Sequence, residues 1–147
     1  MSDRPELIRG GVSTDDRGRV LFANDFDLID CRRLYFVENF DVGTVRGWHA
    51  HRHERKWVLA VSGAALAACV EIDDWDSPSK NQEVYRFVLD AGNPGVLSIP
   101  PGFANGAMSL APQTKLLYLS DAALGASLDD DIRYPARYWD PWEVTER

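Results

Sequence analysis

The three histidines of the chain stand at alternate positions, His49, His51 and His53, in a segment that reads as a β-strand. Side chains at alternate strand positions point to the same face of a sheet. Histidine is the side chain whose ordinary pKa lets it take up and release protons near neutral pH. We therefore assign functional roles to His49 and His51, and we interpret His53 as structural.

Two glycine-bounded motifs surround these positions. The first contains His49 and His51, and the second covers residues 95–105 and ends at Asn105. They resemble the two motifs of the cupin superfamily, whose metal-binding members supply two histidines and a glutamate from the first and a histidine from the second. Here Lys56 stands at the glutamate position and Asn105 at that of the last histidine. Because an ammonium group repels a divalent cation, we predict a site without a metal or other cofactor, suited to an organic anion.

The elements that must position these residues are short strands. Runs with two-residue alternation or β-branched and aromatic residues, separated by turn residues, predict strands at 7–13, 19–23, 32–39, 46–51, 56–62, 64–73, 83–89, 95–99, 105–110 and 114–120. No apolar stripe of helical period precedes residue 122. We therefore expect an all-β fold, a single domain over residues 1–147 built as a cupin or jelly-roll β-barrel of about ten short strands.

The C-terminal tail, residues 122–147, differs in composition and is expected to be short, irregular or helical. It contains an acidic run at residues 129–131, which we interpret as a solvated turn. A stretch rich in tyrosine, tryptophan and proline follows at residues 134–142, and we expect its aromatic rings to pack on the barrel.

Charge and composition exclude some classes of function. The formal charge of −7 disfavours nucleic-acid binding. The sequence has no apolar run long enough for a membrane span and no secretory signal, so we expect no membrane association and a cytoplasmic location. Cys31 and Cys69 are isolated and fit reduced thiols. A locally basic cleft can still bind an anion, because several basic residues cluster between Arg46 and Lys56.

Several segments resemble enzymes that act on dTDP-4-keto-6-deoxy sugars. Three of them are similar to the dTDP-sugar 3,4-ketoisomerases: residues 16–18, 33–36 and 46–51, the last reading Arg-Gly-Trp-His-Ala-His. Three others are similar to dTDP-4-dehydrorhamnose 3,5-epimerase: residues 76–78, 99–106 and 116–118. Together the matches span roughly residues 15 to 142, and both families imply a homodimer.

The resemblance implies particular roles. His49 matches the catalytic base of the epimerase, Lys56 the basic residue near the keto oxygen and Tyr118 the proton donor. Substrate binding is expected from Arg17, Arg33, Arg46, His51 and Asn105. Arg17 and Arg46 match arginines that contact substrate phosphates or sugar. The aspartate that orients the base in the family has no match, so either another carboxylate supports His49 or the mechanism is abbreviated.

These residue types also suit the chemistry directly. A C–H beside a ketone can be removed when a base of near-neutral pKa faces it and positive charge or hydrogen-bond donors meet the developing enolate. Inversion of the carbon then needs an acid on the opposite face, for which a tyrosine is suitable. We expect a metal-independent epimerase of a nucleotide-diphospho-4-keto-6-deoxy sugar, acting at C3, C5 or both. The alternatives are a 3,4-ketoisomerase, which uses His49 and His51 on one side, and a non-catalytic cupin that binds a sugar nucleotide.

Overall fold

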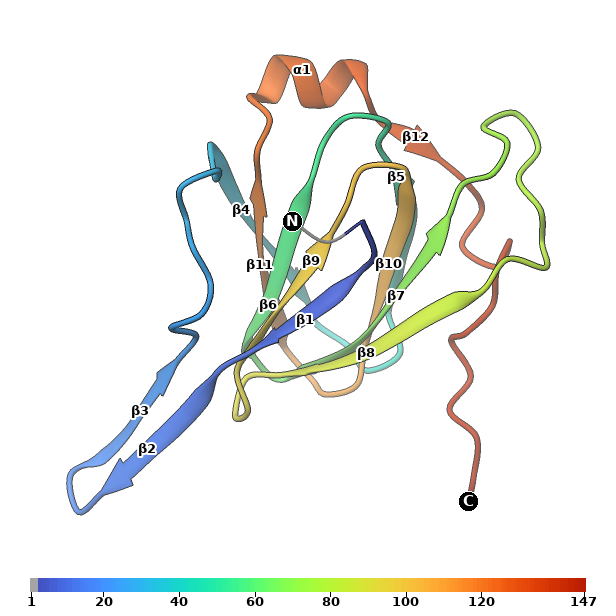
Figure 1. The fold of residues 1–147 in the computed structure, drawn as a ribbon. Helices are drawn as coiled ribbons and strands as arrows, with labels where there is room; N and C mark the ends of the chain where they lie inside the picture. The colour runs from blue at the N-terminus through green and yellow to red at the C-terminus, as the bar shows by residue number, and fades with distance from the viewer. Residues whose placement is uncertain (1–2) are drawn as a thin grey trace.

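Two five-stranded antiparallel sheets face each other across an apolar interior in the computed structural model, which describes residues 3–147 (Figure 1). The elements are β1 (Glu6–Arg9), β2 (Gly11–Asp15), β3 (Gly18–Phe22), β4 (Arg33–Asn39), β5 (Val45–Ala50), β6 (Lys56–Ser62), β7 (Ala64–Glu71), β8 (Val84–Asp90), β9 (Gly95–Ile99), β10 (Phe103–Ser109), β11 (Thr114–Ser120), α1 (Leu124–Asp129) and β12 (Ile132–Arg133). One sheet has the order β1-β9-β6-β11-β4 and the other β12-β5-β10-β7-β8. The predicted all-β cupin or jelly-roll barrel with a short helical tail is confirmed.

The expected first strand, residues 7–13, is instead divided between two sheets. The chain turns away from the barrel at Gly10, whose N–H donates to the carbonyl of Pro94. A Cβ at this position would lie 1.9 Å from the carbonyl oxygen of Phe22, so only glycine fits the crossing. Beyond it, β2 and β3 form a two-stranded hairpin that projects from the barrel (Figure 1).

Inward-facing positions change from apolar to polar toward one end of the barrel. On β6 the alternate residues Ala60, Val58 and Lys56 are all buried, and they run from the apolar core to a charged group. On β11 the corresponding series ends at Tyr118 and Ser120. The alternation of strand side chains thus directs both the core residues and the polar ones into the same interior. The polar end lies beneath α1 (Figure 1).

The C-terminal tail covers the outer face of the sheet that contains β5 and β10. Trp139 and Trp142 pack against Trp48 with ring centroids 5.3 and 5.1 Å apart, and the indole N–H of Trp48 donates to the carbonyls of Ala136 and Trp139. Gly106 makes room for this contact, because a Cβ there would lie 3.0 Å from the Trp142 ring. The prediction that the tail aromatics pack on the barrel is confirmed.

The interpretation of the acidic run at residues 129–131 as a solvated turn is wrong for Asp130, whereas Asp129 is exposed. Asp130 is buried, and its carboxylate accepts hydrogen bonds from the backbone N–H groups of Arg52, His53 and Glu54 at 2.8, 2.8 and 3.1 Å. Consecutive N–H groups in a loop without a strand partner need an acceptor. Asp130 therefore fixes the loop that joins β5 to β6.

Within residues 3–147, no helix is both long and apolar enough to cross a membrane. Both cysteines are free thiols, with Cys69 in the barrel interior and Cys31 half-buried in the loop that precedes β4.

Candidate active site

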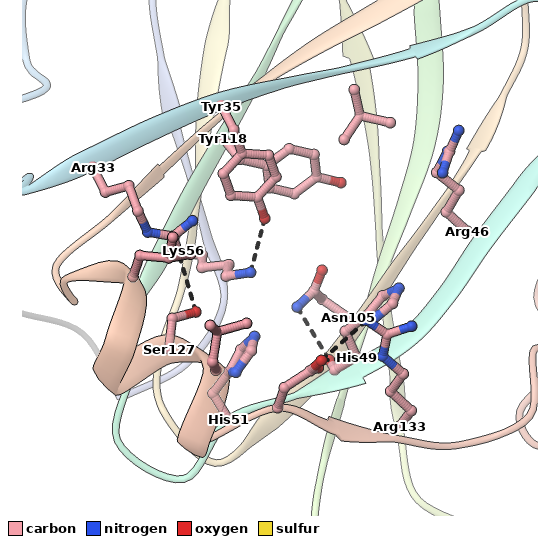
Figure 2. A pocket seen from close by; sticks show the side chains of 14 residues that line it. Arg33, Tyr35, Arg46, His49, His51, Lys56, Asn105, Tyr118, Ser127 and Arg133 are labelled. Atoms are coloured by element: carbon pink, nitrogen blue, oxygen red, sulfur yellow. Dashed lines mark hydrogen bonds and ion pairs between the residues drawn. The ribbon is translucent and has the colours of Figure 1, made fainter.

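A cavity of about 290 Å³ occupies the polar end of the barrel. All the site residues expected from the sequence, apart from Arg17, line this cavity: Arg33, Arg46, His49, His51, Lys56, Asn105 and Tyr118. Figure 2 shows that most of them approach the cavity from strands of both sheets, while His51 comes from the loop after β5 and Ser127 from α1. The structure thus brings together residues from positions 33 to 118 of the sequence.

Arg17 lies elsewhere. It sits in the turn between β2 and β3, at the tip of the projecting hairpin, and its exposed guanidinium pairs with Asp15. Arg17 does not line the cavity, so a single chain does not place it with the other expected site residues.

A bulge in β5 turns both Arg46 and His49 into the cavity. These residues are three apart and would point to opposite faces of a regular strand. In the ladder with β10, however, Arg46 pairs with Ala107 and His49 with Asn105, two residues that share a face. The extra residue in β5 restores the common direction. The Nε of Arg46 donates to Asn39 at 2.7 Å, which anchors the side chain at the cavity wall.

His49 has the protonation behaviour of a base. Burial lowers its pKa, and the positive charges of Arg133 and Lys56 lower it further, whereas Asp131 acts in the opposite direction. The imidazole is therefore neutral at neutral pH and can accept a proton. The side-chain amide of Asn105 donates to the backbone carbonyl of His49 at 3.2 Å, which fixes the two neighbours relative to each other.

Tyr118 has the protonation behaviour of an acid. Burial raises its pKa well above the ordinary value, so the hydroxyl keeps its proton at neutral pH. The ring stacks on Tyr35 with centroids 5.1 Å apart and planes 4° from parallel. Figure 2 shows the two hydroxyls pointing in different directions, and that of Tyr35 accepts a 2.8 Å hydrogen bond from Lys56.

The donors at this site do not suit a divalent metal. Lys56 lies among the cavity residues, 3.9 Å from Glu54, and Asn105 occupies the position opposite His49. Among residues 3–147, no group of three or more histidines, cysteines and carboxylates is placed to hold a metal ion. The cavity instead collects the positive charges of Arg33, Arg46, Lys56 and Arg133, a set that favours an anion.

Sequence reasoning missed three residues that belong to this site. Tyr35 was within a matched segment, and two-residue alternation from Arg33 would have placed it on the same face. Arg133 pairs with His49 through the two-residue strand β12, and Asp131 lines the cavity beside it. A strand of two residues shows no alternation in the sequence, and its pairing with β5 therefore could not be predicted.

Comparison with known proteins agrees with this geometry. The family model described as dTDP-4-dehydrorhamnose 3,5-epimerase matches residues 9–137, and the chain therefore belongs to that family. No protein with a curated function gives a significant sequence match.

Solved structures share the fold at low identity. The dTDP-4-dehydrorhamnose 3,5-epimerase of Bacillus anthracis, with TDP and PPi bound, is 24% identical with a TM-score of 0.76, and the match covers 97% of this chain and 86% of that one. The corresponding epimerase of Sulfolobus tokodaii is 23% identical, with a TM-score of 0.75 and coverages of 95% and 82%. The 3,4-ketoisomerase QdtA of Thermoanaerobacterium thermosaccharolyticum, in complex with TDP, is 21% identical, with a TM-score of 0.68 and coverages of 94% and 93%.

Proposed function

We propose that this protein is an isomerase that epimerises a nucleotide-diphospho-4-keto-6-deoxy sugar at C3, C5 or both, through an enolate and without a metal. The observation that carries the proposal is that a neutral imidazole, His49, and a protonated phenol, Tyr118, line one cavity together with several cations. Membership of the 3,5-epimerase family supports the same reaction class.

In this mechanism His49 removes the proton from the carbon beside the ketone. Negative charge then develops on the keto oxygen, where the ammonium of Lys56 and the amide of Asn105 stabilise it. Tyr118 delivers a proton to the opposite face of the carbon and inverts it. Lys56 donates to Tyr35, and this hydrogen bond holds the ammonium in the cavity.

The substrate anion is proposed to bind Arg46, Arg33 and Arg133. Guanidinium groups form charge-assisted and often bidentate bonds with phosphate oxygens. The cavity volume of about 290 Å³ suits a hexose, with the diphosphate and nucleoside extending toward the opening. TDP bound to structural relatives of both classes supports a nucleotide-linked ligand.

A 3,4-ketoisomerase of the same substrate class is the second candidate. The observation that favours it is His51, which lines the same cavity as His49 and leaves its Nε2 without a partner among residues 3–147. Two imidazoles on one side can move a proton between neighbouring atoms without inversion.

We also propose a homodimer that completes the site with Arg17. β4 is the edge strand of its sheet, and it exposes Leu34 and Phe36. The hairpin formed by β2 and β3 continues from β1 at the opposite edge of the same sheet, projects away from the barrel and exposes Val20. Pairing of this hairpin with β4 of a second copy would cover both apolar surfaces and the free edge, and would carry Arg17 toward the partner's cavity. Light scattering is expected to give twice the chain mass, and Phe36→Asp is expected to give the monomer with a raised KM.

Incubation with dTDP-4-keto-6-deoxyglucose in deuterated water tests the proposed reaction. Deuterium at C3, C5 or both, with inversion and an unmoved ketone, is the result expected for the epimerase. Deuterium at C4 with the ketone moved to C3 would establish the ketoisomerase, and the absence of both label and product would contradict both.

A further inference from the structure

A buried carboxylate lies behind the cavity, where the sequence motifs give it no role. Glu54 is in the loop between β5 and β6, and its side chain is 1% exposed. It does not line the cavity, yet three basic residues that do line it converge on its carboxylate. They are Arg33, with NH2 3.1 Å from Oε2, His51, with Nδ1 3.5 Å from Oε1, and Lys56, with Nζ 3.9 Å from Oε2.

Glu54 is ionised at neutral pH. Burial by itself raises its pKa, but hydrogen bonds from Ser120 and Ser127 and the positive charge of Lys56 together hold it below the ordinary value. A buried carboxylate without partners would neutralise instead. The charge is therefore kept by the groups around it, and it compensates the positive charge of Arg33 and Lys56.

The contacts of His51 define which of its ring nitrogens carries the hydrogen. Nδ1 lies within hydrogen-bond distance of the backbone carbonyl of Asp130 and 3.5 Å from Oε1 of Glu54, an oxygen without a hydrogen-bond partner among residues 3–147, and both groups are acceptors. Nδ1 must therefore donate. In the neutral ring the lone pair is then on Nε2, which lacks a partner among residues 3–147. The Nε2–H tautomer would instead place a lone pair of Nδ1 against the carbonyl and the carboxylate.

We propose that Glu54 is a positioning residue: its negative charge, together with the carbonyl of Asp130, keeps the hydrogen of His51 on Nδ1, and its carboxylate holds Arg33 and Lys56 at fixed places behind the substrate. The inference rests on the proposed function for its catalytic consequence, but not for its effect on His51. Glu54 is thus a buried carboxylate directly behind the site, but it lies beside His51 and not beside His49.

The test is a ¹⁵N spectrum of the imidazole nitrogens in the free protein, recorded at a pH where His51 is neutral. Wild-type protein is expected to show the Nδ1–H tautomer. Glu54→Gln keeps the side-chain volume, removes the charge and can present an amide N–H to Nδ1, so a fraction of the Nε2–H tautomer is expected. An Nε2–H tautomer in the wild type, or an unchanged tautomer in folded Glu54→Gln, would overturn the proposal.

Two further variants keep the test decisive. Should Glu54→Gln not fold, Ser120→Ala removes a hydroxyl that donates to Oε2 of Glu54 and does not line the cavity. It is expected to shift the tautomer in the same direction by a smaller fraction, and no shift would count against the proposal. Asp121→Asn is the matched control, because Asp121 accepts the N–H of Arg55 in the same loop but makes no contact with His51.

Turnover separates this inference from the proposed function. If both hold, kcat of Glu54→Gln should fall by up to about 100-fold, the loss typical of a catalytic group displaced by about 1 Å. KM should change much less, and Asp121→Asn should keep wild-type kcat. Wild-type protein that is inactive on the keto sugar, but has the Glu54-dependent tautomer, would contradict the function alone. An active wild type whose Glu54→Gln variant keeps full kcat would contradict the positioning role alone.

Discussion

Replacement of Tyr118 by phenylalanine separates the proton donor from the packing of the barrel. The ring of Tyr118 is buried and stacked on Tyr35, and phenylalanine preserves both contacts. In residues 3–147 the Tyr118 hydroxyl has no hydrogen-bond partner, so its removal leaves no protein group unsatisfied. We therefore expect the free energy of unfolding to change by less than about 1 kcal/mol.

The effect on catalysis should be much larger. Loss of one general acid typically lowers the rate about 10²- to 10⁴-fold, which raises the barrier by about 3 to 5 kcal/mol. The two magnitudes differ enough for unfolding and turnover measurements to distinguish a chemical role from a structural one.

The assay follows both proton exchange and stereochemistry in deuterated water. Because His49 still removes the proton, Tyr118→Phe is expected to retain exchange of the substrate C–H while inversion falls steeply. Tyr85→Phe is the matched control, since it removes a hydroxyl from a ring that packs on Phe103 in the core and does not line the cavity; it should keep both exchange and inversion.

A fully active Tyr118→Phe enzyme would refute this reasoning. It would favour the ketoisomerase, for which His51→Ala should be nearly as damaging as His49→Ala. A loss of several kcal/mol in unfolding free energy would show instead that the hydroxyl has a structural role.

Three further predictions follow from the site and its supports. The pKa of His49 lies below its ordinary value, so kcat/KM should fall only under about pH 6.5. Because Arg133 lowers this pKa and Asp131 raises it, Arg133→Gln should shift the acidic fall in the pH–rate profile to higher pH, and Asp131→Asn should shift it to lower pH. Prolonged chelation should leave turnover unchanged, and activity that is lost and then restored by a divalent ion would contradict the metal-free mechanism. Asp130→Ala should lower the free energy of unfolding in urea by about 2 to 4 kcal/mol, because three backbone N–H groups lose their acceptor; the exposed Asp129→Ala should cost less than about 0.5 kcal/mol.

Much of the barrel could be predicted because strand alternation is a local property. The series Ala60, Val58 and Lys56 shows both the core and the site in a single segment of sequence. The two sequence motifs likewise brought His49 and Asn105 together, because β5 and β10 are paired strands in which these two residues lie opposite each other. The site could therefore be assembled from residues that lie on predictable strands.

Features that depend on distant partners could not be predicted. The burial of Asp130 results from a loop 76 to 78 residues away whose N–H groups need an acceptor. Arg133 reaches the site through a two-residue strand. Glu54 stands next to a recognised motif, but its function depends on contacts with Arg33 and Ser120 from β4 and β11.

The most direct test of the central claim is hydrogen exchange between solvent and the carbon beside the substrate ketone. Wild-type protein should exchange this hydrogen for deuterium in the absence of added metal, and His49→Ala should abolish both exchange and product formation. Undiminished exchange by His49→Ala, or no exchange by the wild type while product accumulates, would contradict the account.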